Sequence, residues 1–425
     1  MAVSDTDPIV VTGMGAVTPL GVGVKTNWER LTAGRSGVRR NDRFDVSELA
    51  CQIAGLVPPR AEDEHGFDVL DFVDPKDVKK MDLFIQYGLG AAQEALQQAG
   101  WKPETEADRE ATATIIASGV GGFPNMTASA ITVKERGARR LSPFIVPSFL
   151  ANLAAGWISI RHGFKGPLGT PVTACAAAAQ AIGDGMRMIH TGEAEVAVVG
   201  GAEGSIDPVT IGGFSAARAL ATTFNDRPTE ASRPFDKARD GFVLAEGAAV
   251  LVIEKLSHAL KRGAEPLAVL AGYGTSADAY HLTASPPDGE GAQRAMRLAL
   301  KMGGVSPADI GYVNAHSTST QVGDAAEIAA VASVFANRGK ELAISATKSA
   351  TGHLLGAAGA IASIYTVMAL RTGLLPATLN LDDPDESAAV FDLIAKTPKP
   401  KDVAYALVNA FGFGGVNASL LVGRV

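Results

Sequence analysis

Short apolar runs that end in glycine or a small polar residue recur along the chain and predict a series of buried β-strands. The run at residues 9–12 is rich in β-branched residues and ends in Gly13-Met14-Gly15, which is typical of a strand followed by a tight turn. Similar runs lie at residues 50–57, 112–118, 195–200, 248–253, 267–275, 342–345 and 404–409.

Segments with helical spacing of apolar residues separate these runs. The pattern predicts helices over residues 26–33 and 74–100, and further helices after residues 175, 253 and 353. Gly263 is expected to end the helix that carries His258 and Lys261. A chain in which strands and helices alternate in this way packs as a layered α/β fold.

The order of elements starts again near residue 265. Residues 267–275 resemble the opening strand and its Gly-x-Gly turn, and residues 404–409 with the glycines after them resemble residues 196–201. We therefore expect two related halves, residues 1–265 and 266–425, that arose by internal duplication. No low-complexity linker separates them, so they are expected to pack as one body.

The composition indicates a globular protein of a reducing compartment. Of the 425 residues, 47% are hydrophobic and 20% charged, and the two cysteines are too few for a disulfide framework. The N-terminus is polar and acidic, unlike a signal peptide, and small or polar residues interrupt the uncharged stretches at 111–133 and 354–370. We expect a cytoplasmic protein without a membrane span. The net charge of −7 argues against general nucleic-acid affinity.

Cys175 is the first candidate for chemistry. Glycine and proline are frequent at residues 163–170, and a run of alanines follows the cysteine, so the thiol is expected in the first turn of a helix. Unpaired N–H groups and the helix dipole lower a thiol pKa at such a position. The alternative is a small, inert residue of a core helix, and Cys51, inside a predicted strand, is interpreted in that way.

Two histidines follow predicted strands in the second half. His316 comes after the apolar residues at 313–315, and His353 lies five residues after Lys348 in the loop beyond the strand at 342–345. Sites in α/β sheets collect at such strand ends. A metal site formed by the two histidines would lack a third soft ligand and the HExxH spacing, so no metal is expected. The opening turn also lacks the third glycine of a dinucleotide fingerprint, and no cofactor is expected.

Several stretches, in order, resemble the elongating β-ketoacyl-[acyl-carrier-protein] synthases, most closely the synthase II type. They are VTGMGAVTPLG at 11–21, SPFIVPS at 142–148, TAC at 173–175, SRPFDKARDGFVLAEGA at 232–248, VNAHSTST at 313–320, TKSATGHLLGAAG at 347–359 and NAFGFGGVNAS at 409–419. The resemblance runs nearly end to end. It implies the thiolase-like fold, in which two pseudo-symmetric α/β halves form a layered αβαβα sandwich.

The resemblance also implies a reaction in fatty-acid elongation. Cys175 would take an acyl chain from acyl carrier protein as a thioester. Malonyl carrier protein would then lose carbon dioxide, and the resulting enolate would attack the acyl-cysteine to give a 3-oxoacyl carrier protein. His316 and His353 would donate hydrogen bonds to the malonyl thioester as neutral imidazoles, each with its tautomer fixed by a partner on the other nitrogen. Lys348 would tune the field around His316.

Other roles are assigned by the resemblance alone. The N–H groups of Cys175 and Phe411 would form the oxyanion hole, and the Phe411 side chain would gate the acyl pocket. The remaining substrate contacts would be Val120, Phe214, Thr318, Thr320 and Phe413. A valine at position 120 leaves room for long acyl chains.

The expected partners are acyl carrier protein and a second copy of the chain. Because carrier protein is acidic, its docking surface should be basic. The candidate docking residues are Lys79, Lys80, Arg139, Arg140 and Arg218.

The chain departs from the family pattern at three places. Ser317 stands where glycine is usual, and residues 176–179 are all alanine where serine, threonine and glycine are common. Ala362 replaces a glutamate that pairs with the lysine in the family. The charge partner of Lys348 is therefore open. Asp324 and Glu327 are nearby in sequence, but the sequence does not place them.

Rival functions differ in their reactive residues. A thiolase needs a second cysteine late in the chain, and none follows Cys175. An initiating synthase III uses a Cys-His-Asn set rather than two histidines. A partner subunit that acts as a chain-length factor usually lacks the cysteine. A specialised condensing enzyme for very-long-chain lipid or polyketide-type products stays open as an alternative.

Overall fold

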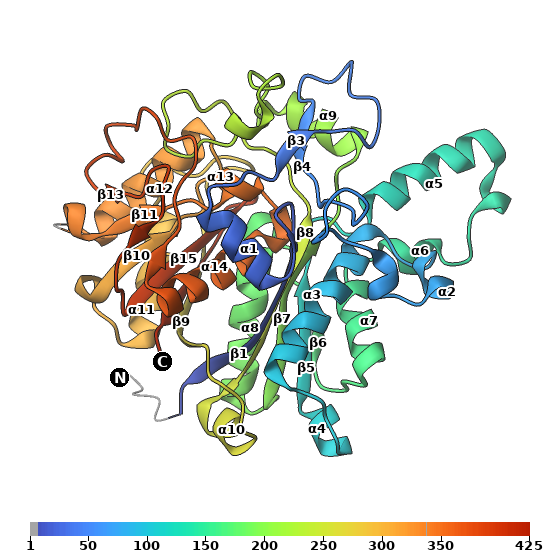
Figure 1. Ribbon diagram of the computed structural model, residues 1–425, viewed down its shortest axis with the longest axis horizontal. Coiled ribbons are helices and arrows are strands. Elements are labelled where there is room, and N and C mark those ends of the chain that lie inside the picture. The colour runs from blue at the N-terminus through green and yellow to red at the C-terminus, as the bar shows by residue number, and fades with distance from the viewer. Residues whose placement is uncertain (1–6, 337) are drawn as a thin grey trace.

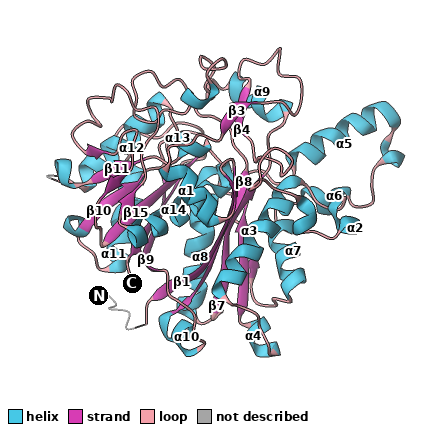
Figure 2. Ribbon diagram, in the orientation of Figure 1, coloured by secondary structure: helices cyan, strands magenta, loops and turns pink. Residues whose placement is uncertain are grey.

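A computed structural model describes residues 7–336 and 338–425 and has one large mixed sheet at its centre (Figures 1 and 2). The strands of the first half are β1 (Ile9–Thr18), β5 (Thr112–Ala117), β6 (Leu168–Gly169), β7 (Val196–Glu203) and β8 (Gly247–Lys255). Those of the second half are β9 (Ala268–Ala277), β10 (Ile310–Asn314), β11 (Ala343–Ser345), β13 (Asp392–Leu393), β15 (Tyr405–Gly412) and β16 (Val416–Gly423).

The two sets of strands have the same order and directions. In the first half the order is β1-β8-β7-β5-β6, with two antiparallel pairs followed by two parallel pairs. In the second half β9-β16-β15-β10-β11 repeats this pattern, and β13 extends it. Pairing of Val10 with Val269 and of Val11 with Ala268 joins β1 to β9. The repeated order of elements expected from the sequence is therefore present.

Helices complete five layers. On one outer side, α3 (Leu83–Ala99) and α7 (Leu153–His162) contact the strands of the first half. In the middle, α8 (Ala177–Thr191) contacts β5 and β7, while α14 (Ala358–Thr372) contacts both β15 and α8. On the other outer side, α11 (Glu290–Gly303) contacts β9 and β16, and α12 (Gln321–Val334) packs on α11. This is the αβαβα architecture that the sequence resemblance implies.

Small residues allow the two middle helices to approach closely. Ala178 and Ala179 of α8 are fully buried. A Cβ on Gly359 would lie only 2.7 Å from the backbone nitrogen of Ala179, and one on Gly201 would lie 2.9 Å from the Ala178 Cβ. Larger side chains here would overpack the interior. The run of alanines after Cys175 therefore fits the narrow space between the two halves.

Several sequence-predicted elements are confirmed with shifted ends. The segment 74–100 is divided into α2 (Pro75–Val78) and α3, and the Asp82 carboxylate accepts a hydrogen bond from the Leu83 N–H at the start of α3. The strand expected at 50–57 is the short β4 (Ile53–Gly55), which pairs with β3 (Val38–Arg40) beside the buried Cys51. The segment Leu355–Thr372 is apolar enough to cross a membrane, but 83% of it is buried inside the protein. It is a core segment.

The remaining elements lie around this framework. They are β2 (Gly21–Val22), α1 (Val24–Thr32), α4 (Glu106–Glu110), α5 (Phe123–Arg136), α6 (Ile145–Phe149), α9 (Pro208–Ala216), α10 (Leu256–Lys261), α13 (Lys348–Thr351), β12 (Leu374–Leu375) and β14 (Lys399–Pro400). Figure 1 shows α5 extending away from the body of the molecule.

Candidate active site

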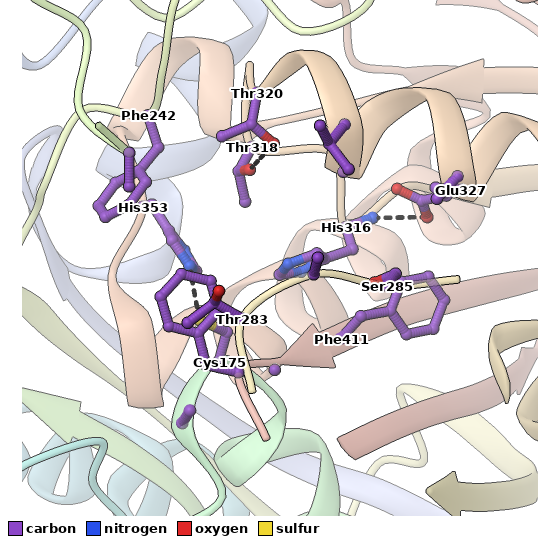
Figure 3. A pocket seen from close by; sticks show the side chains of 18 of the residues that line it. Cys175, Phe242, Thr283, Ser285, His316, Thr318, Thr320, Glu327, His353 and Phe411 are labelled. Carbon is purple, nitrogen blue, oxygen red and sulfur yellow. Dashed lines mark hydrogen bonds between the residues drawn. The ribbon is translucent and has the colours of Figure 1, made fainter. Parts of the chain in front are cut away.

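A cavity of about 570 Å³ lies between the two halves and collects most of the sequence-predicted site residues. The side chains of Cys175, His316, His353 and Phe411 line it (Figure 3). The first half contributes the cysteine, and the second contributes both histidines and the phenylalanine. Strands of different halves therefore end at one site, as expected for sheets of this kind.

Cys175 lies in a single 3-10 turn, Ala174–Ala176, immediately before α8. The preceding Ala174 has φ 50°, in the left-handed region that residues with a Cβ rarely adopt. Such strain persists where the surrounding structure over-determines the conformation. It turns the thiol toward the second half, where Cys175 Sγ lies 2.9 Å from His353 Nε2.

The two imidazoles face one another across the cavity, with ring centroids 5.5 Å apart and planes at 80°. His316 follows β10, and His353 follows the short helix α13. The first half holds the His353 backbone, because the His353 N–H donates to the Val243 carbonyl at 2.8 Å. The Phe242 ring packs edge-on against the His353 ring at 5.4 Å.

Burial determines the charge of both histidines. It lowers the pKa of His316 and of His353 well below the ordinary value, and the nearby Lys348 ammonium lowers both further. Both rings are therefore neutral near pH 7 and can donate from one nitrogen. Neither Nδ1 has a hydrogen-bond partner in the described part of the chain, so the partner expected to fix each tautomer is not found there.

The expected low pKa of Cys175 is wrong. Burial raises the pKa of this thiol to about 12, against the lowering effects of Lys348 and of the backbone N–H groups of Phe413 and Cys175. The cost of desolvating a thiolate inside the low-dielectric cavity is larger than the stabilisation that the start of a helix provides. The thiol pKa therefore rises. The resting nucleophile is a neutral thiol next to a neutral imidazole.

Lys348 lies behind the histidines, is 5% exposed and does not line the cavity. Burial lowers its pKa to about 8, and the negative charge of Glu327 is the largest of the effects that oppose this lowering. Ala362 cannot supply a charge, and its carbonyl instead accepts a hydrogen bond from Asn314 Nδ2 at 3.1 Å. Glu327 is thus the main carboxylate acting on Lys348.

Asp324 and Glu327 are the functional residues that sequence reasoning could not place. Both lie in the first half of α12, directly after the His316 loop, and both are buried. Glu327 Oε1 accepts a hydrogen bond from the His316 N–H at 2.9 Å. Asp324 Oδ1 accepts from the Thr318 N–H at 2.9 Å, and burial raises the Asp324 pKa to about 7. The sequence feature that could have located them is a pair of carboxylates three residues apart at the start of a helix.

The end of β15, with Phe411 and Gly412, and the glycines after it line the site from the other side. The Phe411 ring lies 5.6 Å from the His316 ring. A Cβ on Gly412 would lie 2.7 Å from the Thr173 carbonyl oxygen, so only glycine fits against the turn that carries Cys175. The backbone N–H of Phe413, rather than that of Phe411, reaches the Cys175 sulfur.

The other predicted contacts are divided between the cavity and the outer surface. Val120, Phe214, Thr318, Thr320 and Phe413 all line the cavity. Of the five basic docking candidates, only Arg218 lines it.

The four remaining docking candidates lie outside the cavity. Lys80 pairs with Asp77 at 2.6 Å and lies over the Phe144 ring, next to the exposed Lys79. Arg139 and Arg140 are exposed in the 3-10 turn that follows the projecting helix α5. Among the described residues, no three His, Cys, Asp or Glu side chains are close enough to hold a metal ion.

Comparison with known proteins agrees with this geometry. The model of the β-ketoacyl synthase N-terminal domain matches residues 6–259, and that of the C-terminal domain matches residues 267–382. A 3-oxoacyl-[acyl-carrier-protein] synthase 2 of Rhizobium meliloti is 46% identical over 416 residues, which cover 98% of each chain. The chain belongs to the β-ketoacyl synthase family.

Solved structures of other β-ketoacyl synthases share the whole fold. A synthase from Burkholderia phymatum superposes with a TM-score of 0.90 at 33% identity, over 99% of this chain and 100% of that chain. A chain from a type II polyketide acyl-carrier protein in complex with its ketosynthase gives a TM-score of 0.89 at 29% identity, over 99% and 100%. The thiolase-like fold inferred from the motifs is confirmed.

The raised pKa of Cys175 predicts slow alkylation that accelerates with pH. In a Cys51→Ser variant of this synthase, the rate of iodoacetamide labelling should rise about tenfold per pH unit between about pH 7 and 9, because the thiolate fraction is small throughout. N-acetylcysteine serves as the reference and should begin to level off near its own pKa. A labelling rate for Cys175 that reaches a plateau below about pH 8 would contradict the burial effect.

Proposed function

We propose that this β-ketoacyl synthase catalyses the decarboxylative Claisen condensation of malonyl-acyl carrier protein with an acyl chain bound to Cys175, giving 3-oxoacyl-acyl carrier protein in fatty-acid elongation. The observation that carries the proposal is the 2.9 Å contact between the Cys175 sulfur and His353 Nε2, with His316 in the same cavity. The curated relatives named 3-oxoacyl-[acyl-carrier-protein] synthase 2 support it.

In the first half-reaction, Cys175 attacks the acyl thioester of the carrier. The bond from the acyl carbon to the cysteine sulfur forms, and the bond to the carrier sulfur breaks. His353 Nε2 is close enough to accept the thiol proton and return it to the departing carrier thiolate. The N–H groups of Cys175 and of the Phe411–Phe413 segment stabilise the oxyanion that forms between these steps.

In the second half-reaction, the neutral imidazoles of His316 and His353 donate to the malonyl thioester carbonyl. His353 does so in the tautomer that carries its proton on Nε2, not in the one whose Nε2 accepts the thiol proton. As carbon dioxide leaves, the electron pair of the broken C–C bond forms an enolate, which these two donors stabilise. The enolate carbon attacks the acyl carbonyl, and the cysteine sulfur leaves as a thiolate that takes up one proton from solvent to restore the resting thiol. The positive charge of Lys348, which the charge of Glu327 favours, adds to burial in keeping the histidines neutral.

A non-condensing partner subunit is the less favoured alternative. A bystander needs neither a nucleophile nor an acceptor for its proton, and here the thiol and the imidazole are in contact. A specialised product, such as a very long acyl chain, remains compatible with the same residues.

Two variants separate the half-reactions. Cys175→Ala should gain no acyl mass after incubation with acyl carrier protein thioester, whereas Cys51→Ala should load like the wild type. His316→Ala should still load Cys175 but condense about 10²–10³-fold more slowly, because one donor to the developing enolate is lost. Mass spectrometry and a product assay measure both steps, and acyl mass on the Cys175→Ala protein would refute the assignment.

Val120 is proposed to set the length of acyl chain that the pocket accepts. It lines the cavity together with Phe214 and Phe242 and leaves more room there than a larger aliphatic residue would. In Val120→Phe, turnover with acyl chains of about 16 carbons should fall about tenfold relative to chains of about 8, because the ring fills pocket volume. The exposed Val390→Phe is the matched control, and an unchanged length profile would reject the role.

Acyl carrier protein is proposed to dock over the cavity mouth at Arg218, with Lys79, Lys80, Arg139 and Arg140 as further basic contacts. Arg218 is exposed and lines the cavity. Its backbone has φ 55°, in the left-handed region. Arg218→Glu should raise the KM for carrier-bound substrates about five- to tenfold at low salt, with a smaller effect at high salt. The exposed Arg35→Glu is the control, and equal KM values at low salt would exclude Arg218.

We also propose that the protein is cytoplasmic and forms a homodimer. Within each chain, the two halves are proposed to divide near residue 265. Support for the dimer comes from exposed apolar residues on and near the sheet edge at β6, where Leu168 is 45% and Val172 53% exposed, together with Val146 and Leu150 on and after α6. Such patches mark association surfaces. Sedimentation equilibrium at micromolar concentration would contradict the dimer if it showed only a monomer.

A further inference from the structure

The residue after His316 is a serine whose side chain is 1% exposed. Its hydroxyl donates to Glu327 Oε2 at 2.7 Å, and its backbone N–H donates to the same oxygen at 2.6 Å. The N–H of His316 donates to the other carboxylate oxygen, Oε1, at 2.9 Å. Two consecutive residues of the catalytic loop therefore hold one buried carboxylate by three hydrogen bonds.

The network continues into the core of the second half. Asn409 Nδ2 donates to Glu327 Oε1 at 3.0 Å, and the Ser419 hydroxyl donates to Asn409 Oδ1 at 2.8 Å. Each oxygen of Glu327 thus accepts two hydrogen bonds, and β15 and β16 anchor one side of the arrangement. A buried charge is tolerated when hydrogen bonds satisfy it in this way.

Glu327 connects this network to the charge behind the histidines. The buried Lys348 ammonium is within electrostatic range of Glu327 and Asp324 of α12, and its charge lowers the pKa of both His316 and His353. Glu327 provides the largest of the interactions that favour the charged ammonium of Lys348. Any movement of its carboxylate therefore changes both the His316 backbone and the charge next to both imidazoles.

We propose that the Ser317 hydroxyl is a positioning group for the condensation step, which fixes the Glu327 carboxylate and, through it, His316 and Lys348. This inference rests on the proposed condensing function. Without the hydroxyl, Glu327 Oε2 keeps only the Ser317 N–H as donor and is free to turn toward the Lys348 ammonium. The contact between Cys175 and His353 is made by other segments, so acyl loading should be spared.

The test compares Ser317→Ala with Ser363→Ala in the full-length protein. Ser363 is a buried serine whose hydroxyl donates to the Gly359 carbonyl within α14 at 2.8 Å and takes no part in the Glu327 network. Acyl loading of Cys175 is followed by mass spectrometry. Condensation is followed as kcat, KM for malonyl carrier protein and a pH–rate profile.

We expect Ser317→Ala to load acyl chains at the wild-type rate and to lower kcat of condensation about tenfold, with KM changed less than twofold. The alkaline limb of its profile should move to higher pH, because Glu327 acts more strongly on the Lys348 ammonium when it has one fewer donor. Ser317→Gly, which removes the same hydroxyl, should reproduce the effect. Ser317→Thr, which keeps a hydroxyl, should restore most of the rate.

Other outcomes overturn the inference. A Ser317→Ala enzyme with wild-type condensation and an unchanged profile shows that the hydroxyl has no role. Equal losses in loading and condensation, or the same loss in Ser363→Ala, show a merely structural effect. If the wild type loads Cys175 but yields no 3-oxoacyl product, the proposed function itself fails, and this result is distinguishable from the others.

Discussion

The site depends on the close contact between the two helices at the centre of the molecule. Because Ala178, Ala179 and Gly359 carry so little side chain, α8 and α14 lie close enough for the turn before one helix to meet the loop before the other. That contact places the Cys175 sulfur 2.9 Å from an imidazole encoded in the opposite half. The two halves are joined in the sheet through the β1–β9 pair, and α14 of the second half packs on α8 of the first.

Desolvation then sets the protonation states. The same burial that keeps water from the enolate raises the pKa of Cys175 and lowers those of His316, His353 and Lys348. Each shift favours the neutral form. Near pH 7 the Cys175 thiol and both imidazoles are therefore uncharged. Lys348 retains its charge near pH 7 through the carboxylates of α12.

Two of the three departures from the family pattern bear on one network. The alanine at position 362 leaves Lys348 without a carboxylate from α14, and Glu327 of α12 acts on it instead. The serine at position 317 adds a hydroxyl donor to that same carboxylate. The two changes lie on different elements and meet only at Glu327 and Lys348, so their relation is a property of the folded protein.

Local sequence patterns predicted the alternating elements and their duplicated order, because strand ends and glycine turns depend on neighbouring residues. They marked Cys175, His316 and His353 only as candidates, and the family resemblance assigned these residues and Lys348 their roles. The sign of the Cys175 pKa shift was not predictable, since it depends on how much water the folded chain excludes. The position of Glu327 was not predictable either, because its hydrogen-bond partners lie at residues 316–317 and 409. The same holds for the interaction of the Phe413 N–H with the Cys175 sulfur. Those depend on contacts between residues far apart in the chain, which only the tertiary structure decides.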